Sequence, residues 1–268
     1  MPYFGYIYFW LWFCPMKKSS IFYIILLSLS LINTTIAGTI DPKSKDEDHI
    51  SYGAKYNSVV VLCSLKNEQL YKASAVIIKP QWILTAAHAV YDHHDHHIIY
   101  NDEKTFIDKI ILPTDFNIKK FGYKDLALGR LSKQVVIDIC PELYSKTDEI
   151  GQITSIVGYG DTGTFSTGST IRDNLKRGGT NTIDYIENDL LVCSVLNIPH
   201  TPMEFLIASG DSGGGLFIDN KLAGINSGIW NNNNTTKPKS TYSTQSGHTR
   251  ISQFKNWIIE SIEKSSTK

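Results

Sequence analysis

The chain has 268 residues, a formal net charge of zero and 42% hydrophobic residues. This composition allows a sizeable buried core, and the length fits one large domain or two small ones. Because neither a basic patch nor an acidic tail is visible, we expect no nucleic-acid partner. Tyr, Ile, Ser, Thr, Asn and Gly are frequent, which favours an all-β fold.

The N-terminal 37 residues have the pattern of a secretory signal peptide. Lys17 and Lys18 precede an apolar run at residues 21–32, and the small residue Ala37 marks a cleavage point. The sequence therefore predicts a secreted or periplasmic protein, with residues 1–37 removed as the signal peptide.

Residues 1–15 precede this pattern, and we interpret them as an upstream extension with Met16 as the true start. A membrane anchor is the competing interpretation, because part of this extension is also apolar. A spanning helix needs about 20 apolar residues, whereas Pro15 and the two lysines divide this stretch. We therefore expect no stable membrane anchor.

Residues 38–50 are polar and charged and contain Pro42, which predicts an exposed leader. We treat residues 38–56 as a candidate propeptide and residues 57–263 as the folded domain. Short apolar runs that are joined by turns rather than by amphipathic helices predict a barrel or a sandwich. These runs are 58–62, 74–78, 82–85, 107–112, 126–131, 153–160, 181–195, 216–218 and 222–228.

Two further segments complete the predicted organisation. Residues 161–181 are rich in Gly, Ser and Thr, and we predict mobile surface loops there. Near the C-terminus, apolar residues recur at i, i+3, i+4 and i+8, which predicts one amphipathic helix closing the chain. These residues are Phe254, Trp257, Ile258 and Ile262.

A cluster of four histidines admits two interpretations. It consists of His93, His94, His96 and His97. Adjacent histidines on a loop can bind zinc or copper. No cysteine is nearby, however, and such polar clustering is typical of a solvated loop, so we assign no metal.

Three residues stand at the mouths of predicted strands among small side chains: His88, Asp125 and Ser212. Taken alone, each has an ordinary structural explanation as a packed histidine, a turn-capping acid or a serine in a glycine turn. A serine between glycines is also how a nucleophile is placed beside backbone N–H groups that bind an oxyanion. Their joint occurrence in this order favours the catalytic interpretation.

The segments around these residues resemble the three signature motifs of the trypsin/chymotrypsin family of serine peptidases. They are Thr85-Ala86-Ala87-His88, Asp125-Leu126-Ala127-Leu128 and Gly210-Asp211-Ser212-Gly213-Gly214. Weaker matches are Trp82, Gly158-Tyr159-Gly160, Gly224-Ile225-Asn226-Ser227, and Thr249-Arg250-Ile251 with Trp257, so the resemblance covers roughly residues 57–263. It implies two six-stranded antiparallel Greek-key β-barrels with the active site between them and a C-terminal α-helix, as in a bacterial-type member.

An α/β-hydrolase is the rival assignment. Gly210, Ser212 and Gly214 also fit the Gly-x-Ser-x-Gly nucleophile elbow of that fold. There the acid and then the histidine follow the serine in sequence. Only 56 residues follow Ser212 here, and His248 is their single histidine. We therefore reject this assignment.

The family resemblance also implies a mechanism. Ser212 would attack the scissile carbonyl, His88 would act as general base, and Asp125 would hold His88 in the right tautomer. Ser227 is implied to hydrogen-bond to Asp125, and the backbone N–H groups of Gly210 and Ser212 to form the oxyanion hole. No cofactor is implied, and we expect a monomer that acts on a protein or peptide substrate.

The cysteine pattern departs from the family. Ala89 replaces the cysteine beside the catalytic histidine, and Ala73 stands at its usual partner position. Three cysteines remain after residue 37; Cys63 with Cys140 is a candidate bridge, and Cys193 would be free. We therefore expect the core, rather than disulfides, to stabilise the fold.

The primary specificity pocket is the second departure. By the resemblance, Leu206 lies at its base, Ile229 and Ser246 on its walls, and Ser227 beside it. Leucine at the base predicts an apolar or small side chain, rather than Lys or Arg, before the scissile bond. Glu204 is close enough in sequence that a small alignment shift would bring an acid into the pocket.

Activation is the third departure. In many members the acid before the nucleophile pairs with the ammonium of a newly released Ile-Val-Gly-Gly terminus. Asp211 is present here, but that sequence is not. Either processing releases Ile40 or Ile50, or Asp211 is satisfied within the chain.

These observations predict a secreted serine endopeptidase that hydrolyses peptide bonds through an acyl-enzyme. Two alternatives stay open. One is a binding or regulatory homologue of the same fold with weak catalysis. The other is an esterase acting on non-peptide acyl substrates by the same chemistry.

Overall fold

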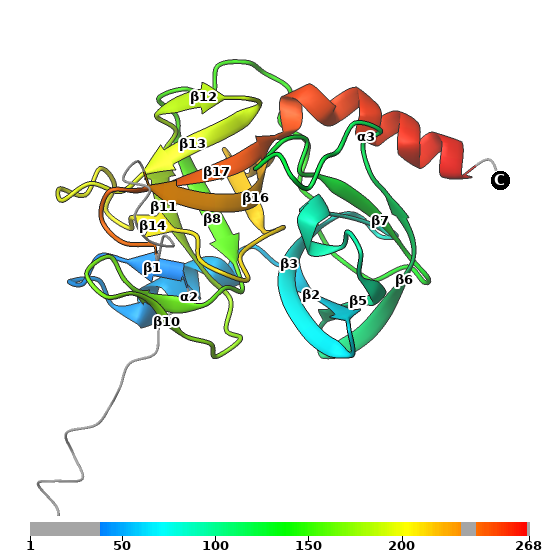
Figure 1. Cartoon of the computed structure of the whole chain (residues 1–268), viewed down its shortest axis with the longest axis horizontal. Coiled ribbons are helices and arrows are strands. Elements are labelled where there is room, and N and C mark those ends of the chain that lie inside the picture. The colour runs from blue at the N-terminus through cyan, green and yellow to red at the C-terminus, as the bar shows by residue number, and fades with distance from the viewer. Residues whose placement is uncertain (1–37, 232–239, 267–268) are drawn as a thin grey trace, which may run out of the picture. The chain divides into compact units, whose positions relative to one another are not determined.

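The computed structural model describes residues 38–231 and 240–266, so the predicted signal peptide lies outside the described residues. The described chain forms two packed groups of mainly antiparallel strands, seen side by side in Figure 1, followed by a C-terminal helix. No helix in this part of the chain is long and apolar enough to cross a membrane.

Six antiparallel strands close into the first barrel in the order β2-β3-β4-β7-β6-β5. They are β2 (Val59–Lys66), β3 (Gln69–Lys79), β4 (Trp82–Thr85), β5 (His94–Tyr100), β6 (Glu103–Ile111) and β7 (Ala127–Leu131). Successive side chains of a strand point to opposite faces, so Val60 and Leu62 fill the barrel while Val59 packs towards the second group of strands. Burial on both faces explains why the first half of β2, residues 59–62, is wholly apolar.

The second group contains a seven-stranded antiparallel sheet in the order β11-β8-β15-β16-β17-β13-β12. Its strands are β8 (Ile153–Gly158), β11 (Arg177–Thr182), β12 (Tyr185–Glu187), β13 (Leu190–Ser194), β15 (Gly215–Ile218), β16 (Lys221–Asn231) and β17 (Thr244–Arg250). A four-stranded sheet in the order β10-β9-β1-β14 completes it, built from β1 (Gly38–Ile40), β9 (Thr162–Thr164), β10 (Gly168–Ile171) and β14 (Phe205–Leu206). The predicted all-β class is confirmed. The six-stranded count holds for the first barrel, whereas the second group has this more elaborate, barrel-like arrangement.

The segment predicted as an exposed leader is part of the fold. Residues 38–40 form the buried strand β1, and a nine-residue helix, α2 (Asp46–Ala54), packs against β11. The fully buried Arg177 guanidinium donates from Nε and Nη2 to the two carboxylate oxygens of Asp46, at 2.6 and 2.7 Å. The prediction was wrong because the charge pattern does not show that the distant Arg177 pairs with Asp46.

The Gly-, Ser- and Thr-rich stretch 161–181 is likewise more ordered than predicted. It contains β9, β10 and the start of β11, and its side chains Phe165 and Arg177 are fully buried. Gly163 packs directly against the backbone of Gly168, so the absence of a Cβ atom is what lets β9 and β10 meet there. The glycines of this stretch therefore allow close strand packing rather than mobility.

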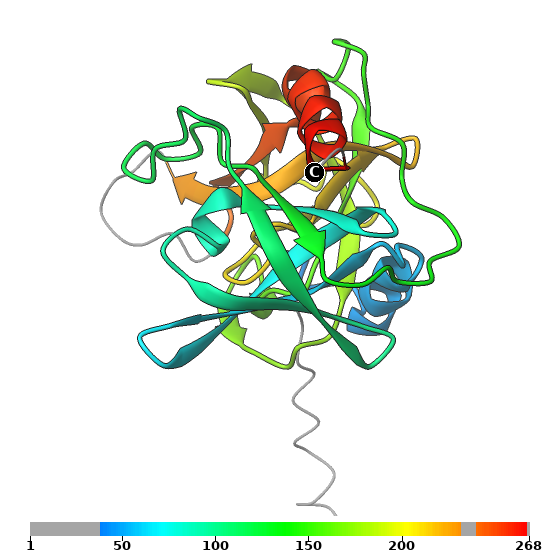
Figure 2. The same cartoon turned by 90° about the vertical axis from the view of Figure 1, so that its right-hand side faces the viewer.

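The C-terminal helix α3 (Ile251–Ser266) joins the two groups of strands. As predicted, Phe254, Ile258 and Ile262 line one face and are buried. They share a core cluster with Leu128 of the first barrel and Ile225 of the second. Figure 1 shows the helix leaving β17 and running over the first barrel, and Figure 2 shows it nearly end-on.

Candidate active site

The nucleophile candidate lies in the loop between β14 and β15. Gly210 and Gly213 have φ angles of +93° and +86°, a region that residues with a Cβ atom rarely adopt. A Cβ on Gly213 would also overlap the carbonyl oxygen of Ser74. The glycines around Ser212 are thus required by a tight turn packed against the first barrel.

Ser74 of β3 holds this loop in place. Its N–H donates to the carbonyl oxygen of Ser212 at 2.8 Å, and its hydroxyl donates to that of Gly210 at 3.0 Å. The same hydroxyl accepts the N–H of Tyr159 at 3.0 Å. Ser74 cannot be recognised from the sequence, because its partners are distant in the chain and it resembles an ordinary residue of an apolar strand.

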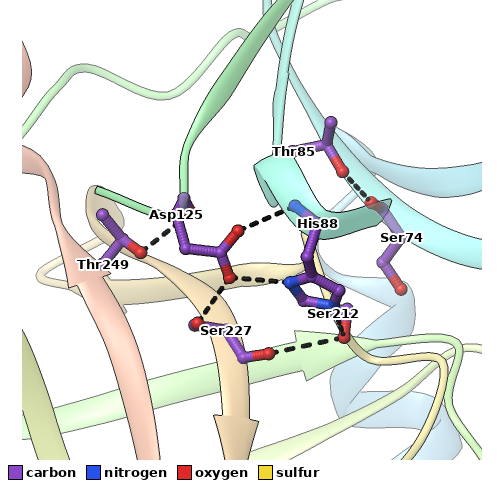
Figure 3. Close-up of polar contacts among 7 residues, drawn as sticks. All are labelled: Ser74, Thr85, His88, Asp125, Ser212, Ser227 and Thr249. Atoms are coloured by element: carbon purple, nitrogen blue, oxygen red, sulfur yellow. Dashed lines mark hydrogen bonds and ion pairs between the residues drawn. The ribbon is translucent and has the colours of Figure 1, made fainter. Parts of the chain in front are cut away.

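His88, Asp125 and Ser212, far apart in sequence, come together between the two groups of strands (Figure 3). His88 is on the short 3₁₀ turn η1 (Ala87–Ala89) after β4, and Asp125 precedes β7. The ring atom Nδ1 of His88 lies 2.7 Å from Oδ2 of Asp125, and its Nε2 lies 2.9 Å from Oγ of Ser212. The three side chains form one continuous hydrogen-bonded line.

Asp125 is fixed by further contacts. Its side chain is almost completely buried; Oδ1 accepts the backbone N–H of His88 at 2.9 Å, and Oδ2 accepts the Ser227 hydroxyl at 2.6 Å. The Thr249 hydroxyl donates to its carbonyl oxygen at 2.9 Å. The Ser227 contact that the family resemblance implied is therefore present, while Thr249 is an anchor that the sequence did not reveal.

The two titrating groups stabilise each other's charged form. Burial alone would raise the pKa of Asp125, but the hydrogen bonds and positive charge of His88 outweigh it, and the pKa is lowered. Burial alone would lower the pKa of His88, but the hydrogen bond and negative charge of Asp125 outweigh it, and the pKa is raised. An ionised Asp125 accepts from Nδ1–H, which leaves Nε2 to accept the Ser212 proton.

The backbone around Ser212 presents two N–H groups. Within the described residues, the N–H groups of Gly210 and Ser212 donate to no backbone or side-chain acceptor. The neighbouring N–H groups of Asp211, Gly213 and Gly214 each have one. The two groups expected to form an oxyanion hole are thus those left available.

Asp211 has partners within the chain. Its carboxylate accepts the N–H of Gly160 at 2.7 Å and that of Ala208 at 2.8 Å. Complete burial raises its pKa to about 7. The two candidate new termini, Ile40 and Ile50, lie within β1 and α2. Of the two alternatives that the sequence left open, this arrangement corresponds to an Asp211 satisfied internally.

The four residues assigned to the primary pocket are largely enclosed. Ser227 and Ser246 are buried, Ile229 is half-buried and pairs with Ser246 across β16 and β17, and Leu206 packs with Phe165 in a separate apolar cluster. Glu204 lines a different cavity, beside Asp41, Pro42 and Tyr242. None of the four residues assigned to the primary pocket is acidic, and Glu204 does not join them.

A buried histidine, His248, lies beside the proposed pocket residue Ser246. Nε2 of His248 lies 2.9 Å from the Ser246 hydroxyl, and Nδ1 lies 2.8 Å from Oδ1 of Asn226. Burial lowers the pKa of His248 to about 3, so the ring is neutral. The sequence does not reveal this line of contacts, because Asn226 and His248 lie on different strands.

Two cavities flank the line of three side chains. One, of about 180 Å³, is lined by His88, Asp125 and Ser227 together with Phe116, Ile118, Lys120, Phe121 and Gly122. The other, of about 300 Å³, lies beside Ser212 against β2 and β3. A substrate bound across these three side chains would therefore contact a mainly apolar cavity on one side. On the other side it would contact the cavity lined by residues of β2 and β3.

The predicted disulfide is absent. Cys63, Cys140 and Cys193 are all free among the described residues. Cys63 faces away from the barrel interior, because its neighbour Leu62 points inwards, whereas Cys140 packs against that interior. Cys63 and Cys140 are therefore not placed to form a bridge. Ala73 and Ala89, where the family carries a pair of cysteines, line one cavity.

The histidine cluster was predicted to be a solvated loop, but most of it is strand. β5 begins at His94 and includes three of the four histidines. His96 contacts the Ser64 hydroxyl at 2.8 Å, while His97 packs against Phe106 and His93 against Tyr71. Within the described residues, no three or more His, Cys, Asp or Glu side chains are arranged so that they could hold a metal ion.

Comparison with known proteins places this geometry in context. The family model described as Trypsin matches residues 52–258. A solved structure of neuropsin, a serine protease expressed in the limbic system of mouse brain, is similar to the chain with a TM-score of 0.62. At 19% identity, the match covers 77% of this chain and 95% of that structure, which is a likeness of fold. No curated protein matches the chain.

Proposed function

Because the chain belongs to the trypsin family of serine peptidases, we propose that it is an endopeptidase that cleaves peptide bonds through an acyl-enzyme on Ser212. The observation that carries this proposal is the hydrogen-bonded line from Asp125 through His88 to Ser212, with contacts of 2.7 and 2.9 Å. A nucleophile, a base within reach of it and a group that orients the base are the components of this chemistry.

In the proposed reaction, Ser212 Oγ attacks the carbonyl carbon of the scissile bond as its proton passes to His88 Nε2. Asp125 stays ionised and stabilises the imidazolium that forms, which the lowered pKa of this carboxyl favours. The same proton then goes to the leaving amine. Water attacks the resulting ester by the reverse use of His88, and the acid product leaves.

The negative charge that develops on the carbonyl oxygen needs donors that are already in place. The free N–H groups of Gly210 and Ser212 supply them, and Ser74 keeps the loop in the shape that presents both. Removing one such donor typically slows an acyl-transfer enzyme by about 10²- to 10³-fold. We therefore assign these two groups as the oxyanion hole.

The proposed substrate has an apolar or small residue before the scissile bond. Leu206, Ser227, Ile229 and Ser246 are the proposed pocket residues, and none carries a charge that would attract Lys or Arg. Phe116, Ile118 and Phe121 offer further apolar contacts near His88. The proposal includes export through the N-terminal segment, and a fold held by its core agrees with the three free cysteines.

Hydrolysis of an unbiased peptide library, followed by mass spectrometry of the products, tests the proposal. Cleavage is expected for the unmodified chain and must be lost in Ser212→Ala. Ser209→Ala is the matched control, because Ser209 is an exposed serine of the same loop whose hydroxyl makes no contact with His88. Peptide binding without cleavage by the unmodified chain would instead support the regulatory homologue.

A further inference from the structure

The cavity of about 300 Å³ beside Ser212 carries positive charge. The first barrel contributes Lys66 from β2, Lys72 from β3 and His93. The remaining lining residues are Ser64, Tyr71, Ala73, His88, Ala89, Gly210 and Ser212. No carboxylate lines the cavity, and neither do any of the four residues proposed for the primary pocket.

Lys72 is placed by the strand that holds the nucleophile loop. Residues i and i+2 of a strand share a face, so the side chain of Lys72 is on the same face as that of Ser74, whose hydroxyl contacts Gly210. Lys72 is half-buried, and its ammonium donates to the amide oxygen of Asn174 at 2.9 Å. That partner is uncharged, so the positive charge of Lys72 is not neutralised by it.

Lys66 adds to this charge only in part. The Lys66 ammonium lies 3.5 Å from a carboxylate oxygen of Asp92, whose side chain is 74% exposed. A pair this exposed is weak and leaves Lys66 able to reorient. His93 uses Nδ1 in a contact with the carbonyl oxygen of Tyr91. Lys72 is therefore the cation with the strongest claim on an incoming acid.

We propose that this cavity binds the part of the substrate that follows the scissile bond and selects an acidic side chain there, with Lys72 as the main determinant. The inference rests on the proposed function. If the substrate residue before the scissile bond occupies the primary pocket, the substrate residues after that bond must pass the cavity beside Ser212. There an Asp or Glu side chain would meet Lys72 and, at longer reach, Lys66.

The test uses internally quenched peptides that share a small apolar residue before the scissile bond and carry Glu or Gln at one of the three positions after it. At low salt, kcat/KM for the best Glu peptide should exceed that for its Gln counterpart about fivefold, as expected for one partly exposed ion pair. Lys72→Met should bring this ratio to about one, and added salt should lower it. Lys104→Met, an exposed lysine on β6 outside the cavity, is the matched control and should leave the ratio unchanged.

Two further measurements separate this inference from the proposed function. An ester substrate with no residues after the scissile bond should be hydrolysed equally by the unmodified chain and Lys72→Met. In the Ser212→Ala background, fluorescence anisotropy should show tighter binding of the Glu peptide than of the Gln peptide, again lost in Lys72→Met. A Glu-to-Gln ratio of one or less, or one that persists in Lys72→Met, would overturn the inference while peptide cleavage itself stood. Absence of any cleavage and of any difference in binding would overturn both.

Discussion

The Asp125 carboxylate accepts hydrogen bonds from the His88 backbone, the His88 ring and the Ser227 hydroxyl. These bonds satisfy a buried charge that would otherwise be costly, and they also fix which nitrogen of His88 faces Ser212. Because Ser227 comes from the second group of strands, the orientation of the His88 ring depends on residues from both groups.

Asp125→Asn should lower kcat by about 10⁴-fold, because an amide keeps the size of the side chain but not the charge that holds the right tautomer. Steady-state kinetics on a cleaved peptide would measure this. A matched change at Asp108, whose carboxylate pairs with Arg130 on the surface of the first barrel, should leave kcat within about twofold. Equal effects at the two positions would contradict the role given to Asp125.

The pH dependence of kcat/KM should report His88. Its pKa is raised above the ordinary value of 6.5 by Asp125, so the protonated ring, which cannot accept the Ser212 proton, persists to higher pH. Activity should therefore rise through a midpoint above pH 6.5 and be low below it. The residual activity of Asp125→Asn should rise at a lower pH, because the negative charge is lost. A midpoint at or below pH 6.5 in the unmodified chain would be inconsistent with this geometry.

Much of the proposed site could be predicted from the sequence. His88, Asp125 and Ser212 were recognisable because each stands in a short local motif. Ser74, Thr249 and Lys72 were not, because they act through contacts with residues that are distant in sequence. No local pattern distinguishes a strand serine that braces a loop from one that merely fills space.

Elements N-terminal to the first barrel support the second group of strands. β1 pairs with both β14 and β9, which joins Thr39 to Leu206 of the proposed primary pocket. α2 adds the Asp46–Arg177 pair and a hydrogen-bonding contact between His49 Nδ1 and the carbonyl oxygen of Gly178. Polar composition alone predicted an exposed leader, and only the fold shows that Asp46 has a buried partner in Arg177.

Asp46→Ala should destabilise the protein by about 2 kcal/mol, because the buried Arg177 guanidinium loses two charge-assisted hydrogen bonds while its contacts with Asp173 remain. Chemical denaturation would measure the free energy of unfolding. Glu142→Ala, which removes an exposed ion pair with Lys221, is the comparison and should cost less than about 1 kcal/mol. Equal stability of the two variants would mean that α2 contributes no more than a surface segment.

At the scale of the whole molecule, one core cluster links both groups of strands and α3. Its members include Leu84 and Leu128 from the first barrel, Ile225 from the second group, and Ile258 from the helix. The three proposed catalytic residues also come from both sides of this boundary. Their distances therefore depend on packing that no catalytic motif encodes, although the helical spacing of α3 was visible in the sequence.

Ile258→Ala should lower the free energy of unfolding by about 2–5 kcal/mol, because it leaves a cavity in that cluster. The adjacent residue provides the control. Ile258 is 1% exposed and Ile259 is 41% exposed, so Ile259→Ala should change stability much less. Thermal unfolding followed alongside peptide cleavage would show whether activity and the core are lost together. Similar losses for the two substitutions would contradict the packing described for α3.

Labelling with a fluorophosphonate probe, followed by peptide mapping, tests the central claim most directly. The probe reacts with a serine only where a base and oxyanion donors activate it. We expect stoichiometric modification of Ser212, abolished in Ser212→Ala and retained in Ser209→Ala. A folded chain that takes up no label, or takes it up at another residue, would contradict the claim that Asp125, His88 and Ser212 form a working catalytic site.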